Sequence, residues 1–108
     1  MKVHEVLDRA RELVAHGWHE PFSLDAQGKL CSSDAEGIAK FCMVDALLVA
    51  ARGDVLEESR AEEALTRQLQ LLERDAALFA WLEAPERTHA EVLKLLARAE
   101  AHARVGDE

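Results

Sequence analysis

Residues 88–106, THAEVLKLLARAEAHARVG, contain the signals that start, continue and end an α-helix. Thr88 stands three residues before Glu91, the spacing of a capping box in which the two side chains bond to the first free backbone N–H groups. Gly106 is a residue type that commonly ends helices. Between these ends, apolar residues recur at steps of three and four, namely Val92, Leu93, Leu96, Ala99 and Ala103. We therefore predict a helix over residues 88–104.

Two further helices are predicted in the first half of the chain, over residues 3–16 and 33–52. The first has apolar residues at the same helical spacing. We expect Gly17 to end it with left-handed backbone, which glycine adopts without steric cost. The second begins with Ser33 and Glu36, which again have the spacing of a capping box.

A helix over residues 57–82 is also predicted, and its start is left open. Two capping boxes compete for that start, Asp54 with Glu57 and Ser59 with Glu62. Acidic residues in the first turn suit either start, because they lie at the positive end of the helix dipole.

The helix predicted over residues 57–82 carries leucines on more than one face. Leu71, Leu78 and Leu82 flank the seam that would face the core. Because leucines left outside a core favour association, we predict a homodimer through this helix. A break near Arg74 is the alternative to one continuous helix.

The composition favours an all-α fold. The chain has 108 residues, of which 49% are hydrophobic and only 5% aromatic, with five glycines and two prolines. Sheets are usually richer in aromatic and β-branched residues, and one domain is normal for this length. We predict a single domain over residues 1–108, a compact bundle of four main helices with one long ordered loop over residues 18–32.

The chain is acidic, with a net charge of −8 from 13 Lys and Arg against 21 Asp and Glu. Direct nucleic-acid binding and polybasic membrane anchoring both need clustered cations, so we predict neither. Residues 54–63 alone carry −4, from five carboxylates and one arginine. This concentration indicates one acidic helix start, and an acidic inhibitor or nucleic-acid mimic stays open as an alternative function.

The sequence shows no sign of export. Its first residues alternate charged with apolar side chains, unlike a signal peptide, and its apolar stretches are far shorter than a membrane span. We therefore predict a cytoplasmic protein in which Cys31 and Cys42 are free thiols.

His16, His19 and Glu20 form a cluster of metal-ligating residue types. Gly17 interrupts the helix between the two histidines, so they do not share one helix face as in the His-Glu-x-x-His zinc sites. Histidines at helix ends are also favoured by the helix dipole. We predict no metal and no cofactor, and these three residues are the candidates should a metal bind.

Cys42 and Asp45 stand three residues apart on the apolar face of the helix predicted over residues 33–52. A thiolate nucleophile needs a base or cation beside it, so we interpret Cys42 as a buried core residue. Asp45 is either paired, with Arg87 or a histidine as its partner, or lies at the solvent edge, because an unpaired buried carboxylate is costly. Arg87 itself is predicted to be structural, with Asp45 or Glu83 as its partner.

Trp18 and Trp81 are the two tryptophans of the chain. Each of them either fills the core or contributes to an aromatic wall that holds a ligand or peptide.

Four segments together resemble a bacterial family of small helical proteins, designated domain of unknown function 6197. They are HGW at 16–18, DAQGK at 25–29, FCMVDAL at 41–47 and WLEAPERTHAEVL at 81–93. The chain departs from the family pattern at Asp45, where the family has glycine, and at Leu82 and Glu83, where it has Asn-Asp. The resemblance implies a helical fold and no particular activity.

Two classes of function fit these features. The first, which we favour, is a non-enzymatic protein-interaction or regulatory module whose partner is another protein or a second copy of the chain. The second is a small-molecule site, catalytic or not, under the loop over residues 18–32. Its candidate residues are Trp18, Cys42, Asp45, Trp81 and Arg87. The sequence contains no nucleotide-binding loop or hydrolase motif, so we assign no catalytic residue.

Overall fold

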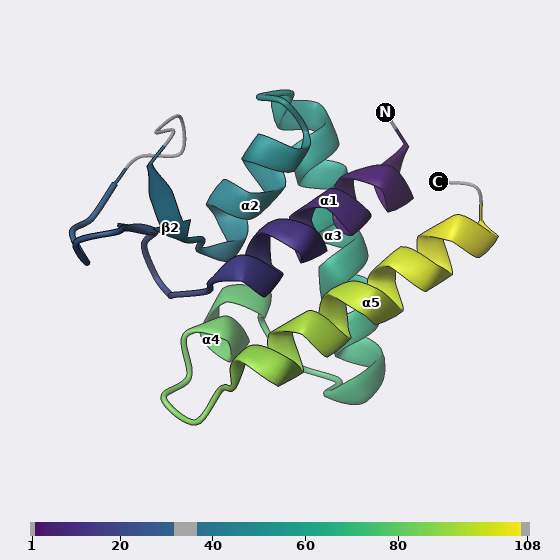
Figure 1. Ribbon diagram of the computed structural model, residues 1–108. Helices are drawn as coiled ribbons and strands as arrows, with labels where there is room; N and C mark the ends of the chain where they lie inside the picture. The colour runs from purple at the N-terminus through teal and green to yellow at the C-terminus, as the bar shows by residue number, and fades with distance from the viewer. Residues whose placement is uncertain (1, 32–36, 107–108) are drawn as a thin grey trace.

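The computed structural model describes residues 2–31 and 37–106 (Figure 1). The described elements, in chain order, are α1 (Val3–His16), β1 (Leu24–Asp25), β2 (Ile38–Lys40), α2 (Met43–Ala50), α3 (Val55–Leu72), α4 (Leu78–Leu82) and α5 (His89–Val105). The protein is mostly helical, as predicted. The described part of the chain also contains a short antiparallel sheet that the sequence did not predict, and it has five helices because the helix predicted over residues 57–82 is divided.

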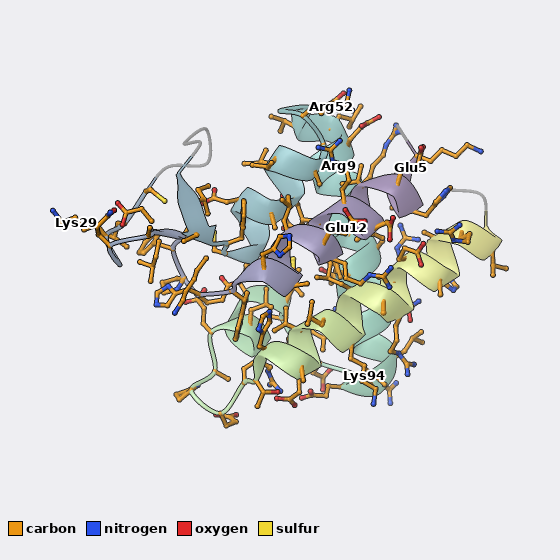
Figure 2. The ribbon with its side chains drawn as sticks, viewed as in Figure 1. Glu5, Arg9, Glu12, Lys29, Arg52 and Lys94 are labelled. Carbon is orange, nitrogen blue, oxygen red and sulfur yellow. The ribbon has the colours of Figure 1, made fainter. Side chains whose placement is uncertain are left out.

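α1 is the central helix of the fold, because it packs against α5, α2 and α3. Figure 1 shows it between α2 and α5, with α3 crossing behind. Its buried face consists of Val6, Leu7, Ala10 and Val14, all without solvent exposure. Its opposite face carries Glu5, Arg9 and Glu12, which are exposed (Figure 2). The helical spacing predicted for residues 3–16 therefore corresponds to one buried and one solvated face.

The helix predicted over residues 33–52 is wrong for residues 37–42, which precede α2 and are not helical. Residues 38–40 form β2, which pairs with β1 at Leu24 with Lys40 and at Asp25 with Ile38. The predicted cap residues Ser33 and Glu36 lie outside the described residues. The apolar spacing around residue 38 suits a helix, but the hydrogen bonds to β1 hold this segment extended.

The helix predicted over residues 57–82 is divided, so the alternative of a break near Arg74 is confirmed. The chain leaves the helix after Leu72 and becomes helical again at Leu78. Asp54 caps the start of α3, because its carboxylate accepts the backbone N–H groups of Leu56 at 3.0 Å and Glu57 at 3.2 Å.

The division of this helix changes the predicted dimer face. Leu78 and Leu82 lie in α4 and are buried, with 4% and 1% of their surface exposed. Their assignment to a dimer surface is therefore wrong. Leu71 and its neighbour Leu72 lie at the end of α3 and remain exposed.

Gly17 ends α1 in extended backbone, with φ 176°, and not in the predicted left-handed conformation. A side chain is excluded there by a close approach, since an added Cβ would lie 2.4 Å from the backbone oxygen of Ala39. The two segments are joined by hydrogen bonds, from the Phe41 N–H to the Gly17 oxygen at 2.9 Å and from the His19 N–H to the Phe41 oxygen at 3.1 Å. Gly17 thus lets the segment before α2 lie directly on the end of α1.

Candidate functional site

The described part of the long loop, residues 18–31, folds against the start of α2. Ser23 is the contact at its centre and has no solvent exposure. Its hydroxyl accepts the backbone N–H of Cys42 at 2.9 Å and donates to the Asp45 Oδ2 at 2.6 Å. The prediction that this segment packs on the helices is therefore confirmed for the described residues, which also include β1.

Glu20 makes the second contact between the loop and α2. Its Oε2 accepts the backbone N–H of Met43 at 2.8 Å and the indole N–H of Trp18 at 2.9 Å. Burial raises the pKa of Glu20, and these two donors act in the opposite direction. The Glu20 carboxylate thus loses contact with water on burial and is stabilised by these two hydrogen bonds at the start of α2.

These contacts explain how α2 begins although Cys42, its N-cap residue, makes no side-chain cap hydrogen bond. The first N–H groups of a helix lack partners within the helix, and here Ser23 and Glu20 supply them from the loop. Burial raises the pKa of the Cys42 thiol, the opposite of what a thiolate nucleophile needs. The polar groups at this end of α2 are therefore occupied by folding contacts. Cys31 and Cys42 are both free thiols.

Trp18 joins the loop to α5. Its indole stacks on the His89 ring, with centroids 6.1 Å apart and planes inclined by 21°. The Nε2 of His89 lies 2.6 Å from the backbone oxygen of Val14. Trp18 also packs against the core, so it fills space between the loop and the helices.

The three metal candidates serve separate contacts. His16 is exposed, the Nδ1 of His19 lies 2.7 Å from the Phe22 oxygen, and Glu20 caps α2. Within residues 2–31 and 37–106, no group of three or more His, Cys, Asp or Glu residues could hold a metal ion.

Within the described residues Arg87 pairs with neither Asp45 nor Glu83, so its predicted pairing is wrong. The Arg87 guanidinium lies over the Trp81 ring, 3.8 Å from its centroid. Its Nε–H donates to the Trp81 backbone oxygen at 2.8 Å, and a terminal N–H donates to Glu91 at 3.0 Å. Arg87, which precedes the N-cap of α5, is therefore balanced by the carboxylate of Glu91 in the first turn of that helix, while Asp45 is bound by Ser23.

Trp81 and Arg87 face a groove of about 250 Å³ between the end of α3, α4 and the first half of α5. Its apolar lining consists of Leu72, Trp81 and Leu95. Its charged lining consists of Arg87, Lys94, Arg98, Glu73 and Glu91. We call this the α3–α5 groove. Figure 1 shows α4, the end of α3 and the first half of α5 in the lower half of the molecule, and Figure 2 labels Lys94 there.

The side chains that form the groove are held in place before any partner binds. The Trp81 indole N–H donates to Glu73 at 2.8 Å, and the Arg87 side chain is only 11% exposed. Lys94 and Arg98 are exposed, one turn apart on α5, and make no ion pair within the described part of the chain. The groove therefore combines a fixed aromatic and guanidinium wall with two cations available to a partner.

The five candidates taken from the sequence fall into two groups. Trp18, Cys42 and Asp45 lie at the contact between the loop and α2, whereas Trp81 and Arg87 face the α3–α5 groove. The sequence reasoning missed Ser23 as the link in the first group, and Leu72, Lys94 and Arg98 in the second. The spacing of Lys94 and Arg98 by four residues was the available signal, but the groove beside them arises from the break between α3 and α4.

The acidic start of α3 contains a buried carboxyl group. Glu58 is 7% exposed, and its Oε1 has no hydrogen-bond partner among the described residues. Burial, reinforced by the neighbouring Glu62, raises the pKa of Glu58 to about 7. The folded state therefore favours the protonated acid at pH values where an exposed glutamate is ionised.

This environment predicts a stability that depends on pH. Because the pKa of Glu58 is higher in the folded than in the unfolded state, folding binds a proton, and stability falls as the pH rises from about 4.5 to about 7. We expect Glu58→Gln to leave the free energy of unfolding unchanged at pH 4 and to raise it by about 1–2 kcal/mol at pH 8. Urea denaturation at both pH values measures this. Glu63→Gln is the control, because its carboxylate is 67% exposed, and a gain at pH 8 equal to that of Glu58→Gln would contradict the prediction.

No helix in the described part of the chain is long and apolar enough to cross a membrane. Neither a curated protein nor a solved structure matches the chain. Residues 1–102 match the model of a family of unknown function, DUF6197, and this chain belongs to that family.

Proposed function

We propose that this protein is a non-enzymatic, cytoplasmic interaction module that binds a segment of a partner protein in the α3–α5 groove. The observation that carries the proposal is the fixed pair of Trp81 and Arg87 on the groove wall. Tryptophan and arginine are the residue types that most often dominate binding energy at protein interfaces. Because both are already held by hydrogen bonds, a partner does not have to order them.

The surface around the groove supports a protein partner. Leu72, which lines the groove, is 54% exposed, and its chain neighbour Leu71 is 73% exposed, so exposed apolar side chains lie at this end of α3. Charged side chains, among them Lys94, Arg98 and Glu91, also line the groove. Protein interfaces have the same arrangement, an apolar centre surrounded by a polar rim. Two free thiols suit a reducing compartment such as the cytoplasm.

The partner segment is expected to carry acidic and apolar side chains together. The groove lining contains three cations and two carboxylates, hence a local charge of +1 in a chain of net charge −8. The two carboxylates already bond to Trp81 and to Arg87. Lys94 and Arg98 are thus the groups that select negative charge.

A peptide-display selection on the immobilised protein tests this function. We expect the enriched peptides to place Asp or Glu beside Leu, Val or Ile, and to perturb the NMR signals of Leu72, Trp81 and Lys94 when titrated into the protein. The variant Lys94→Gln/Arg98→Gln should bind them at least tenfold more weakly, which corresponds to about 1.4 kcal/mol. A selection that enriches no sequence, or whose peptides perturb another surface, would overturn the proposal.

A further inference from the structure

We infer that the segment that fills the α3–α5 groove is the start of α3 of a second copy of this chain, so that copies associate head to tail. This inference rests on the proposed function and names its partner. The partner segment consists of Asp54, Val55, Leu56 and Glu57, which we call the acidic end.

The acidic end has the chemistry that the groove selects. Val55 and Leu56 are 66% and 61% exposed, although they are large apolar side chains. The carboxylates of Asp54 and Glu57 flank them, within the segment that carries −4 over residues 54–63. The apolar side chains of the acidic end would contact the apolar lining of the groove, and its carboxylates would lie near Lys94 and Arg98.

One molecule cannot bring its own two surfaces together. They lie at opposite ends of α3, whose 18 residues span about 27 Å at 1.5 Å per residue. Figure 2 labels Arg52, beside the start of α3, and Lys94, on the groove, at opposite sides of the molecule. The two complementary surfaces can therefore meet only between copies.

This geometry differs from a symmetric dimer. In a symmetric dimer each copy uses the same patch, whereas here one copy offers the groove and the other the acidic end. Each added copy leaves one groove and one acidic end unused, so association continues into longer chains or a ring. Because the contact is small and charged, it should be weak and should weaken further as salt is added.

Sedimentation of complementary variants tests the inference. The groove variant Lys94→Gln/Arg98→Gln keeps its acidic end, and the end variant Val55→Ser/Leu56→Ser keeps its groove. All four residues are exposed, so both variants should fold, which circular dichroism verifies. We expect the wild type to form species larger than a dimer at millimolar concentration, while each variant alone associates at least tenfold more weakly.

An equimolar mixture of the two variants gives the decisive result. One intact groove then meets one intact acidic end, so the mixture should form a dimer of twice 12.0 kDa and nothing larger. In the mixture, NMR signals of an isotope-labelled end variant should shift at Trp81 and Leu72. A mixture that stays monomeric, or a wild-type dimer that both variants leave intact, would overturn head-to-tail association.

The outcomes separate this inference from the function on which it rests. If the wild type stays monomeric at 1 mM while selected acidic peptides bind in the groove, self-association is wrong and the interaction module stands. If the peptides also fail to bind in the groove, the interaction module is wrong as well.

Discussion

Gly17→Ala is expected to lower the free energy of unfolding by about 3 kcal/mol, the upper part of the range for overpacked sites. The added Cβ would lie 2.4 Å from the backbone oxygen of Ala39 and 3.3 Å from the Cα of Lys40. A flexible side chain could move away at little cost, but these are backbone atoms, and the next residue, Phe41, holds this segment to Gly17 through its N–H. Relief of the clash therefore requires α1 and the strand to separate.

Urea denaturation measures this effect as a lower midpoint with an unchanged slope. Gly37→Ala is the matched control, because a Cβ added there meets nothing within 4 Å. We expect that control to stay within about 0.5 kcal/mol of the wild type. Equal effects of the two substitutions would show that the close approach at Gly17 is not what requires glycine.

The elements that the sequence predicted well are those whose signals are local. α5 begins at the capping box that Thr88 forms with Glu91, in which each side chain bonds to the backbone of the other residue. The residues that cap this helix and the residues that form it are neighbours in the chain, so residue spacing alone predicts where the helix begins. The start of α3 at Asp54 has a local signal too, one of the two capping boxes between which the sequence left the start open.

α2 could not be predicted in this way, because its cap comes from another part of the chain. Ser23 and Glu20, which bond to its first N–H groups, precede those groups by 19 and 23 residues respectively. Because Ser23 and Glu20 lie outside residues 33–52, the spacing of residues within that range does not predict these hydrogen bonds. The capping-box spacing of Ser33 with Glu36, together with the apolar spacing after it, extended the predicted helix into residues that pair as β2.

The candidate site shows the same limit. The sequence identified Arg87 as a cation that needs a partner beside the start of α5, and this requirement is met. The partner, Glu91, lies four residues away and was assigned only to the capping box, whereas Asp45 and Glu83 were named as the candidate partners. The stacking of Arg87 on Trp81 depends on how the chain turns between α4 and α5, which no residue spacing specifies.

Ser23→Ala is expected to lower the free energy of unfolding by about 2–3 kcal/mol, because it leaves the buried N–H of Cys42 without its acceptor and Asp45 without its donor. Urea denaturation gives the value. A second measurement should accompany it: the Cys42 thiol, which is 5% exposed in the wild type, should react faster with a thiol reagent once the loop no longer holds the start of α2. A loss below about 0.5 kcal/mol would contradict the role assigned to Ser23.

A double-mutant cycle separates the hydrogen bond between Ser23 and Asp45 from other effects of the two substitutions. We expect Ser23→Ala and Asp45→Ala to be coupled by about 1.5 kcal/mol, as for hydrogen bonds to charged groups. The matched control is the cycle of Asp45→Ala with Arg87→Ala, which should be additive within about 0.5 kcal/mol, because the two residues have different partners. Coupling in the second cycle and none in the first would mean that Asp45 pairs with Arg87 in solution. The reverse result would show that Asp45 holds the loop to α2 and takes no part in the groove.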